Sequence, residues 1–200
     1  MSTAIFGGTF DPVHKGHIAM VQSVINQFRT DKIIVVPNGN PPHKRDIAIT
    51  EFHHRYNMLC LAFQSEEAVE ISDYEGGLGE YRYSIDTMRH FRNVYGEDTQ
   101  FIIGADSLTS IHTWHMYETL LKENRFIVFR RKASDGFDEA LIKYGSMSRE
   151  MLLSDMPLYP LSSTVVRKYA QDGAIEDYVT PEVYGYIKEH GLYGGCHDSK

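Results

Sequence analysis

The sequence predicts an α/β fold: a Rossmann-like, doubly wound, mostly parallel sheet with helices on both faces. Short apolar runs of strand length alternate with helical segments along the chain. Several of these runs are apolar without interruption, as in parallel strands that are buried on both faces. The chain has 200 residues, which is enough for one such domain. We expect a single domain over residues 1–193 and a mobile tail over residues 194–200.

Apolar runs and periodic segments define the expected elements in order. Strands are expected at 3–6, 32–36, 68–72, 101–104 and 125–129. Helices are expected at 17–28, 52–64, 84–93, 107–122, 137–144, 164–171 and 182–190. The last helix has Thr180 as its N-cap, Pro181 at its first position and Gly191 after its end. This β-α-β-α order implies parallel strands joined by right-handed crossovers.

Composition and charge limit the classes of function. Hydrophobic residues make up 42% and charged residues 24%, which excludes disordered and collagen-like proteins. The net charge is −7, so we expect no nucleic-acid partner, and any phosphate group would have to bind in a local positive site. Two cysteines are too few for a disulfide framework, and no signal peptide or run of 18 apolar residues is visible. We therefore expect a cytoplasmic protein with no membrane partner; a homo-oligomer is possible.

The segment after the first expected strand carries the strongest functional signal. In open α/β sheets, ligands bind beyond the carboxyl ends of the strands. Gly7 and Gly8 let the backbone approach a ligand closely and direct N–H groups at phosphate oxygens. His14 and His17 flank the start of the next helix, whose N-terminus favours anions. The pattern predicts a phosphate-binding turn.

Two further segments have the same character. Residues 162–167 open an expected helix with hydroxyl caps, free N–H groups and the guanidinium of Arg167. Lys44 follows Pro41-Pro42-His43 in a long segment without a strand. Each feature also has an ordinary explanation: a turn, a helix cap, a surface lysine, or a histidine pair that binds a metal. Three such clusters after strands favour a phosphate site.

Together these residues resemble the nucleotidylyltransferase superfamily, which is marked by a His-x-Gly-His turn after the first strand and a Ser-Ser-Thr-x-x-Arg turn before a late helix. Within it, the chain is most similar to the bacterial nicotinate-nucleotide adenylyltransferase family of NAD biosynthesis. The likeness covers nearly the whole chain. Its narrower marks are the Pro-Pro-His-Lys segment at 41–44, and Gly104-Ala105-Asp106 with Trp114.

The resemblance implies a reaction that suits the residues present. The 5′-phosphate of nicotinate mononucleotide attacks the α-phosphorus of ATP in line, displaces pyrophosphate and yields deamido-NAD without a covalent intermediate. A phosphate monoester is mostly dianionic at pH 7, so it is already a nucleophile. The enzyme then has to hold two anions in line and neutralise charge. Mg²⁺ is the implied cofactor, bound through the ATP phosphates, with no metal ligands from protein side chains.

The resemblance also implies roles for individual residues. The implied catalytic residues are His14, His17, Lys44 and Arg167, with His17 nearest the α-phosphate. The implied ATP-binding residues are Gly7, Gly8, Thr9, Phe10, Gly104, Asp106, Ser162, Ser163 and Thr164. The implied mononucleotide-binding residues are Ser84, Trp114 and His115. Trp114, the sole tryptophan, would stack on the pyridine ring, and core packing is its ordinary alternative.

Several alternatives stay open. The family often has Tyr directly after this Trp, where the chain has His115, and often Thr where it has Ser84. These departures leave open an enzyme for nicotinamide mononucleotide, or for both nucleotides. Phosphopantetheine adenylyltransferase shares both phosphate turns but does not resemble the Trp114 region. A non-catalytic nucleotide sensor is the alternative from a different class, and it would bind ATP without releasing pyrophosphate.

Overall fold

A parallel sheet in the order β3-β2-β1-β4-β5-β6 lies at the centre of the protein. The computed structural model describes residues 2–39, 49–76, 82–130, 136–156, 161–171 and 174–194. This strand order is that of a doubly wound Rossmann sheet, and its switch point lies between β1 and β4. The predicted α/β fold class is confirmed, and every strand pair within these ranges is parallel.

The elements alternate along the chain as the sequence predicts. The strands are β1 (Thr3–Gly8), β2 (Lys32–Pro37), β3 (Val69–Ile71), β4 (Gln100–Gly104), β5 (Arg125–Phe129) and β6 (Glu150–Ser154). The α-helices are α1 (Lys15–Phe28), α2 (Phe52–Ala62), α3 (Ser84–Tyr95), α4 (Ala105–Thr109), α5 (Tyr117–Glu123), α6 (Phe137–Gly145), α7 (Ser163–Gln171) and α8 (Pro181–Glu189). Short 3-10 helices are η2 (Ile111–Thr113), η3 (Ile175–Asp177) and η4 (Leu192–Gly194).

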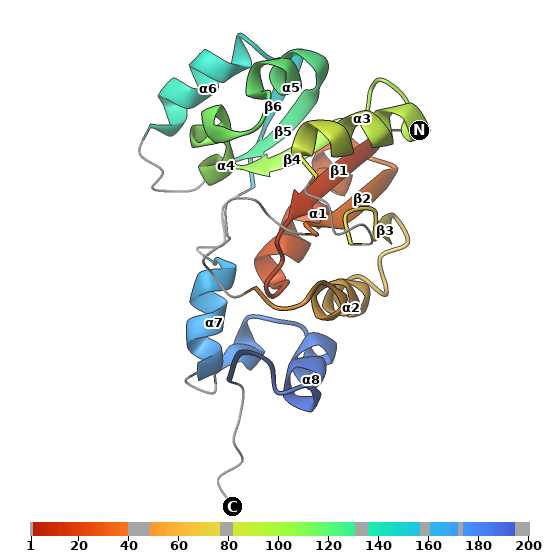
Figure 1. The fold of residues 1–200 in the computed structure, drawn as a ribbon, viewed down its shortest axis with the longest axis vertical. Coiled ribbons are helices and arrows are strands. Elements are labelled where there is room, and N and C mark those ends of the chain that lie inside the picture. The colour runs from red at the N-terminus through yellow and green to blue at the C-terminus, as the bar shows by residue number, and fades with distance from the viewer. Residues whose placement is uncertain are drawn as a thin grey trace, which may run out of the picture.

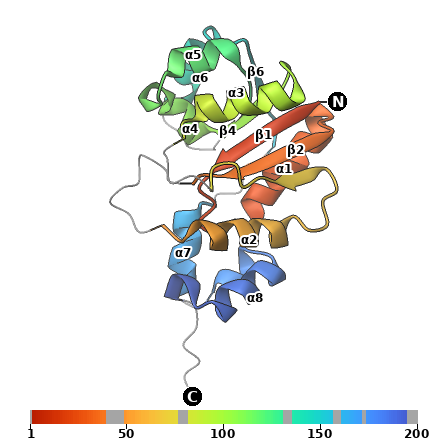
Figure 2. The ribbon, with the colours of Figure 1, turned by 45° about the vertical axis from the view of Figure 1, so that its right-hand side comes forward.

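The sheet separates two apolar cores. Ala4 and Phe6 on β1 pack into one core and Ile5 into the other, as the two-residue period of a strand requires. Helices α1, α2, α7 and α8 close the first core, and α3, α4, α5 and α6 close the second. Figure 1 shows the two groups of helices on opposite sides of the sheet, and Figure 2 shows α7 and α8 beyond α2. Burial on both faces explains why the central strands β1, β2, β4 and β5 contain nearly continuous apolar runs.

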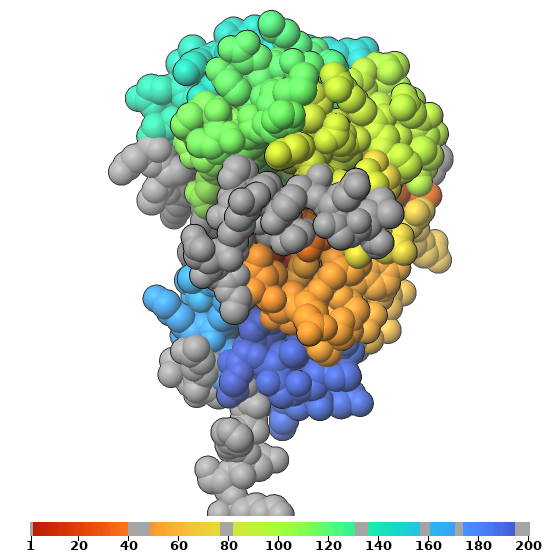
Figure 3. Space-filling model, viewed as in Figure 1, coloured from red at the N-terminus to blue at the C-terminus, as the bar shows by residue number. Residues whose placement is uncertain are grey.

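The last helix begins and ends where the sequence predicts. The Val183 N–H donates to Oγ1 of Thr180 at 3.3 Å, and Pro181 is the first residue of α8. Gly191 follows the helix with a φ of +59°, a conformation that favours glycine. In Figure 3, α8 packs directly against α2. The C-terminal helices are therefore part of the same core as the start of the chain.

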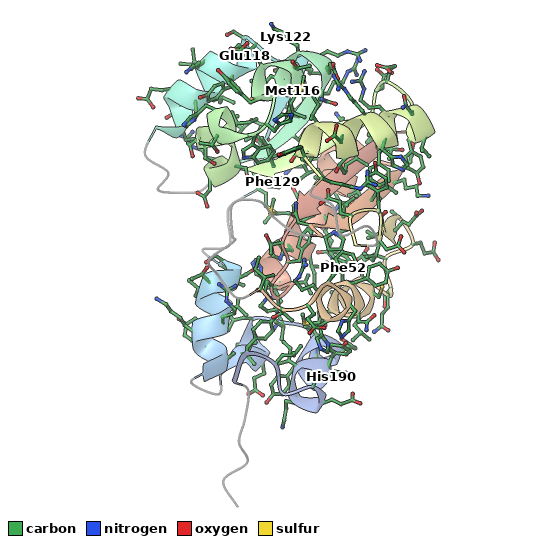
Figure 4. The ribbon with its side chains drawn as sticks, viewed as in Figure 1. Phe52, Met116, Glu118, Lys122, Phe129 and His190 are labelled. Atoms are coloured by element: carbon green, nitrogen blue, oxygen red, sulfur yellow. The ribbon has the colours of Figure 1, made fainter. Side chains whose placement is uncertain are left out.

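The prediction of one helix over 107–122 is wrong. The structure divides this segment into α4, η2 and α5, and Met116 before α5 has a φ of +51°. Leu108 and Ile111 are fully buried, so core contacts override the helical periodicity of the segment. The break leaves Trp114 in an extended conformation. Figure 4 shows Met116, Glu118 and Lys122 at the outer end of this region.

Strand β6 is absent from the sequence prediction. It pairs with β5 along one side, and Leu153 within it is 39% exposed. Its sequence, Glu-Met-Leu-Leu-Ser, has no β-branched residue, so local propensity gives a weak signal. Pairing with β5 makes this segment a strand at the edge of the sheet.

Two expectations from the sequence concern the end of the chain and membrane-spanning helices. Within the predicted tail at 194–200, Gly194 ends η4, and residues 195–200 lie outside the described part of the chain. None of the helices in the described ranges is long and apolar enough to cross a membrane.

Candidate active site

Two adjoining pockets lie at the carboxyl end of β1, beside the switch point of the sheet. Their volumes are about 360 Å³ and 270 Å³. Gly7, Gly8, Thr9, Ser107 and Trp114 line both of them. Two ligands, one in each pocket, would therefore meet over the end of β1, where open α/β sheets bind their ligands.

The first pocket gathers most of the predicted residues. They come from the ends of β1 and β4 and from the starts of α1, α4 and α7, which are far apart in the sequence. The predicted residues that line it are Gly7, Gly8, Thr9, Phe10, His14, His17, Gly104, Asp106, Ser162, Ser163, Thr164 and Arg167. Phe129 adds an apolar wall at the end of β5, and Figure 4 shows it near the middle of the molecule.

The turn after β1 is held by a buried ring. A Cβ on Gly8 would lie 2.9 Å from the ring of Phe10, so glycine is what leaves room for that ring. Phe10 has a φ of +49°, which is strained for a residue with a bulky side chain. Its ring is buried and meets the rings of Phe6 and His17 edge-on, at 5.2 and 5.0 Å between centroids. Burial of the ring thus offsets the strain and fixes the turn.

The two histidines of the turn form one unit. His14 precedes α1 and His17 lies in its first turn, and their imidazoles stack with centroids 3.6 Å apart. The His14 amide donates to Nδ1 of His17 at 3.2 Å, so a neutral His17 carries its proton on Nε2. An imidazole N–H in this position can donate to a phosphate oxygen. The contact with the His14 amide therefore sets both the orientation and the tautomer of His17.

The start of α7 is capped as predicted. The Val165 N–H donates to Oγ of Ser162 at 3.3 Å. The Ser163 hydroxyl donates to the carbonyl of Pro12 at 2.9 Å, which ties α7 to the turn after β1. The first amides of a helix have no acceptor within the helix, so Ser163 and Thr164 can present theirs to an anion.

Arg167 lies one turn into α7 and reaches back to the turn after β1. Its Nη1 donates to the carbonyl of Asp11 at 2.6 Å, and its Nη2 donates to Oγ1 of Thr164 at 3.4 Å. The side chain is 30% exposed and lines the first pocket. The guanidinium is therefore held at two points and still faces the space that a ligand would occupy.

The opposite wall of the first pocket comes from β4. This strand ends at Gly104, the N-cap residue of α4, and Asp106 lies in the first turn of that helix. A Cβ on Gly104 would have no heavy atom of the described residues within 4 Å, so a ligand can approach the backbone there. The Asp106 carboxylate can accept hydrogen bonds from hydroxyl groups such as those of a ribose.

The second pocket brings together Ser84, Trp114 and His115, as the sequence analysis expects of a mononucleotide site. His115 stacks on Tyr83, with centroids 4.1 Å apart. The Trp114 ring lies 6.2 Å from that of Phe101, so it both packs against the core and lines the pocket. Ser84 begins α3, a 12-residue helix whose N-terminus favours an anion.

Sequence analysis missed the buried carboxylate of the second pocket. Glu75 is 8% exposed, and its Oε1 accepts from the Thr87 hydroxyl at 2.6 Å. Its Oε2 accepts from the Asn38 amide group and the Gly39 N–H, both at 3.4 Å. Burial raises the pKa of the Glu75 carboxyl above its ordinary 4.5, and the hydrogen bond from Thr87 opposes that rise. Sequence reasoning gave this residue no role, because its hydrogen-bond partners come from two other segments, residues 38–39 and Thr87.

Arg82 is the other missed residue of the second pocket. Its Nη1 donates to the Tyr74 hydroxyl at 2.7 Å, and its guanidinium lies 4.3 Å from the centre of the Tyr74 ring. Tyr74 stacks on His90 of α3 at 3.9 Å, which keeps this platform in place. The Nε of Arg82 is buried and has no hydrogen-bond partner among the described residues. A cation directly before a helix that begins with Ser84 is the signal that could have found it.

Arg55 of α2 supports the turn after β1 from within the protein. It is 1% exposed and donates to three backbone carbonyls: from Nη1 to Thr9 at 2.8 Å, from Nε to Thr50 at 2.8 Å, and from Nη2 to Gly39 at 3.4 Å. Burial lowers the pKa of the guanidinium, and the nearby Asp11 carboxylate opposes this. The group still remains charged in a folded protein.

The predicted site residues fall in the two pockets, apart from Lys44, which lies with residues 40–48 outside the described part of the chain. In the ranges that the structure describes, no group of three or more His, Cys, Asp or Glu side chains is placed to hold a metal ion.

Comparison with known proteins relates the chain to one family. The chain matches the cytidylyltransferase-like family over residues 5–169. It is similar to a protein of Clostridium tetani named "Probable nicotinate-nucleotide adenylyltransferase", with 38% identity over 95% of this chain and 98% of the relative. A Thermoanaerobacter protein of the same name is 39% identical over 94% of this chain and 92% of the relative. The fold is similar to "Plasmodium falciparum nicotinic acid mononucleotide adenylyltransferase complexed with NaAD", with a TM-score of 0.81 and 24% identity over 98% of both chains.

Proposed function

The chain belongs to the cytidylyltransferase-like family, and we propose that it is a nicotinate-nucleotide adenylyltransferase of NAD biosynthesis. It transfers the AMP group of ATP to nicotinate mononucleotide and yields nicotinate adenine dinucleotide and pyrophosphate. The observation that carries this function is the pair of pockets that share the end of β1. One has donors for a phosphate chain, and the other has an aromatic wall for a planar base.

ATP binds in the first pocket. The backbone of residues 7–10 lines the nucleotide, and Asp106 accepts from the ribose hydroxyls. His14, His17, Arg167 and the first amides of α7 surround the phosphate chain. These groups are donors or cations, and they come from a protein whose net charge of −7 would otherwise repel ATP.

The mononucleotide binds in the second pocket, with its phosphate over the residues that the two pockets share. One phosphate oxygen forms a bond to the α-phosphorus while the bond from that phosphorus to the β-phosphate oxygen breaks, and the electron pair leaves with pyrophosphate. The dianionic nucleophile needs no general base. The protein therefore acts by alignment and by stabilising charge, with Nε2–H of His17 donating to the α-phosphate.

Mg²⁺ enters with ATP. It prefers oxygen ligands and is usually held by one or two carboxylates together with substrate phosphates, without an all-protein cage. The described residues contain no group of three or more His, Cys, Asp or Glu side chains placed for a metal ion, and the Asp11 carboxylate already accepts from Tyr193 at 2.7 Å, so the ATP phosphates would supply the protein-independent ligands. When bound, the ion neutralises charge on the phosphate oxygens.

The second pocket supports the acid, nicotinate, rather than the amide. Arg82 and the N-terminus of α3 supply positive potential beside Trp114, where the pyridine ring stacks. The nearby Glu75 carboxylate is satisfied by its own donors from Thr87, Asn38 and Gly39. The negatively charged carboxylate of nicotinate is therefore attracted to the Arg82 cation more strongly than the neutral amide of nicotinamide would be.

The setting of the reaction is the cytoplasm, with nucleotides as partners. Cys60 is half-buried and is not in a disulfide, as suits a reducing compartment. The net charge of −7 suits small anions bound in a local site better than it suits nucleic acid.

Pyrophosphate release by the purified protein with Mg²⁺-ATP tests this function. Nicotinate mononucleotide, nicotinamide mononucleotide and phosphopantetheine are offered separately, and kcat/KM is measured for each. We expect turnover with nicotinate mononucleotide at a kcat/KM at least tenfold above that of the amide, and none with phosphopantetheine. Equal rates with both pyridine nucleotides would make the enzyme one of dual specificity. ATP binding without pyrophosphate release from any pair would make it a nucleotide sensor.

A further inference from the structure

The carboxylate of Asp11, beneath the turn after β1, is bound to the far end of the chain. Asp11 is 4% exposed. Its Oδ1 accepts from the hydroxyl of Tyr193 at 2.7 Å, across 182 positions of sequence. Its Oδ2 accepts from the Thr50 N–H at 3.4 Å. A buried carboxylate is costly unless its oxygens are hydrogen-bonded, so the two donors keep Asp11 in place.

The same residue also orients the cation of the first pocket. The backbone carbonyl of Asp11 accepts from Nη1 of Arg167 at 2.6 Å, and the carboxylate Oδ2 lies 4.0 Å from that nitrogen. A shift of Asp11 would therefore move the guanidinium that faces the ATP phosphates. His14 lies three residues further along the same turn, so it shares the displacement.

Tyr193 is suited to a permanent role as donor. It belongs to η4, which packs against α7. Burial and the Asp11 carboxylate raise the pKa of its phenol, so the hydroxyl is a hydrogen-bond donor at neutral pH. Its φ of +60° is unusual for a residue with a side chain, and that backbone conformation is part of what brings the ring to Asp11.

We propose that Tyr193 is a positioning residue for adenylyl transfer: by holding Asp11, it keeps Arg167 and the phosphate-binding turn in the geometry that in-line attack requires. The inference rests on the proposed function. Rate depends steeply on alignment, since a misplacement of about 1 Å can cost about 100-fold. A single hydroxyl at the end of the chain thus acts on a reaction to which it makes no direct contact.

The test compares Tyr193→Phe with a matched control, Tyr186→Phe. Both remove one tyrosine hydroxyl from the C-terminal region. The Tyr186 hydroxyl is hydrogen-bonded to Nδ1 of His54 and accepts from the Asn57 amide group, both at 3.0 Å, and it lines neither pocket. For each variant we would measure kcat, KM for both substrates, ATP affinity by calorimetry and Tm.

We expect Tyr193→Phe to lower kcat about 10- to 100-fold and to weaken ATP binding several-fold, with KM for nicotinate mononucleotide within about twofold of wild type. Tyr186→Phe should lower Tm by a similar amount and keep kcat. Equal kcat in the two variants would overturn the inference and leave Tyr193 with a structural role. If the wild-type protein shows no turnover, the proposed function is rejected. The ATP affinities of the two variants would then still decide whether Tyr193 positions the turn.

A second variant changes the acceptor of this hydrogen bond instead of its donor. Asp11→Asn keeps the size of the side chain and the tyrosine, and it places an amide group where one carboxylate oxygen stood. If Tyr193 acts through Asp11, the double variant should lose about as much kcat as the more damaged single variant. If the fold-loss of kcat in the double variant equals the product of the two single-variant losses, the two residues act separately and the inference is rejected.

Discussion

The two pockets meet at the end of β1, but they are built in different ways. The first is made of short sequence motifs whose polar groups are held by the backbone: His17 by the His14 amide, and Ser163 by the Pro12 carbonyl. The second is made of single residues from distant segments, such as Glu75, Arg82 and Trp114. Phosphate groups look alike in many ligands, whereas the base has to be distinguished from close analogues. In the proposed function, the local motif therefore serves the common phosphate chemistry, and the assembled pocket serves base specificity.

The largest effect should come from the first pocket. His17→Ala removes the donor that we propose for the α-phosphate, so we expect kcat to fall about 100- to 1000-fold with either pyridine nucleotide. ATP affinity, measured by calorimetry, should change much less because His14 and Arg167 remain. His112→Ala is the control, since this exposed histidine on η2 lines neither pocket. An unchanged kcat in His17→Ala would contradict the assigned role.

Trp114 tests whether the two pockets are separable. Stacking on an aromatic ring contributes about 1–3 kcal/mol per base, so Trp114→Ala should raise KM for nicotinate mononucleotide about 10-fold or more. KM for ATP should rise less, although Trp114 lines part of the first pocket as well. Trp114→Phe, which keeps a ring, should recover most of the loss. Equal increases in both KM values would mean that Trp114 supports the core against Phe101 and does not bind the base.

Arg82 tests the specificity of the second pocket. Arg82→Gln should lower the ratio of kcat/KM for nicotinate over nicotinamide mononucleotide about 10-fold, since a hydrogen bond to a charged group contributes about 1.5–3 kcal/mol. Arg89→Gln is the control, because Arg89 on α3 pairs with Glu123 and lines neither pocket. If both variants changed the ratio equally, or neither did, Arg82 would not select the acid.

The smallest effect concerns the buried carboxylate of the second pocket. Burial raises the pKa of Glu75 above 4.5. Just above pH 4.5, the Glu75 carboxyl therefore stays protonated in the folded protein, whereas it is ionised in the unfolded chain. The free energy of unfolding contributed by Glu75 is therefore greatest below pH 4.5 and declines as the pH rises through the raised pKa. Urea unfolding between pH 4 and 7 should show a shallower decline in Glu75→Gln than in wild type. An identical slope would mean that the folded state does not raise this pKa.

The sequence predicts the first pocket well and the second only in part. The motifs at 7–17 and 162–167 each act within a few residues of their own helix start, so their role could be inferred before their partners were known. Glu75 and Arg82 depend on Thr87, Gly39 and Tyr74, none of which a local pattern connects to them. The break in the expected helix at 107–122, which frees Trp114 to line the pockets, is likewise decided by core packing.

The sequence by itself determined the layered architecture and the positions of the two turns that line the first pocket. Apolar runs, helix caps and glycines act over a few residues, so a local pattern is enough to predict them. The tertiary structure alone decided that Tyr193 reaches Asp11, that Arg55 binds the carbonyl of Thr9, and that β6 joins the edge of the sheet. These contacts join segments far apart in the chain. Their partners are chosen by the order of strands and the packing of helices, and a local pattern carries no information about either.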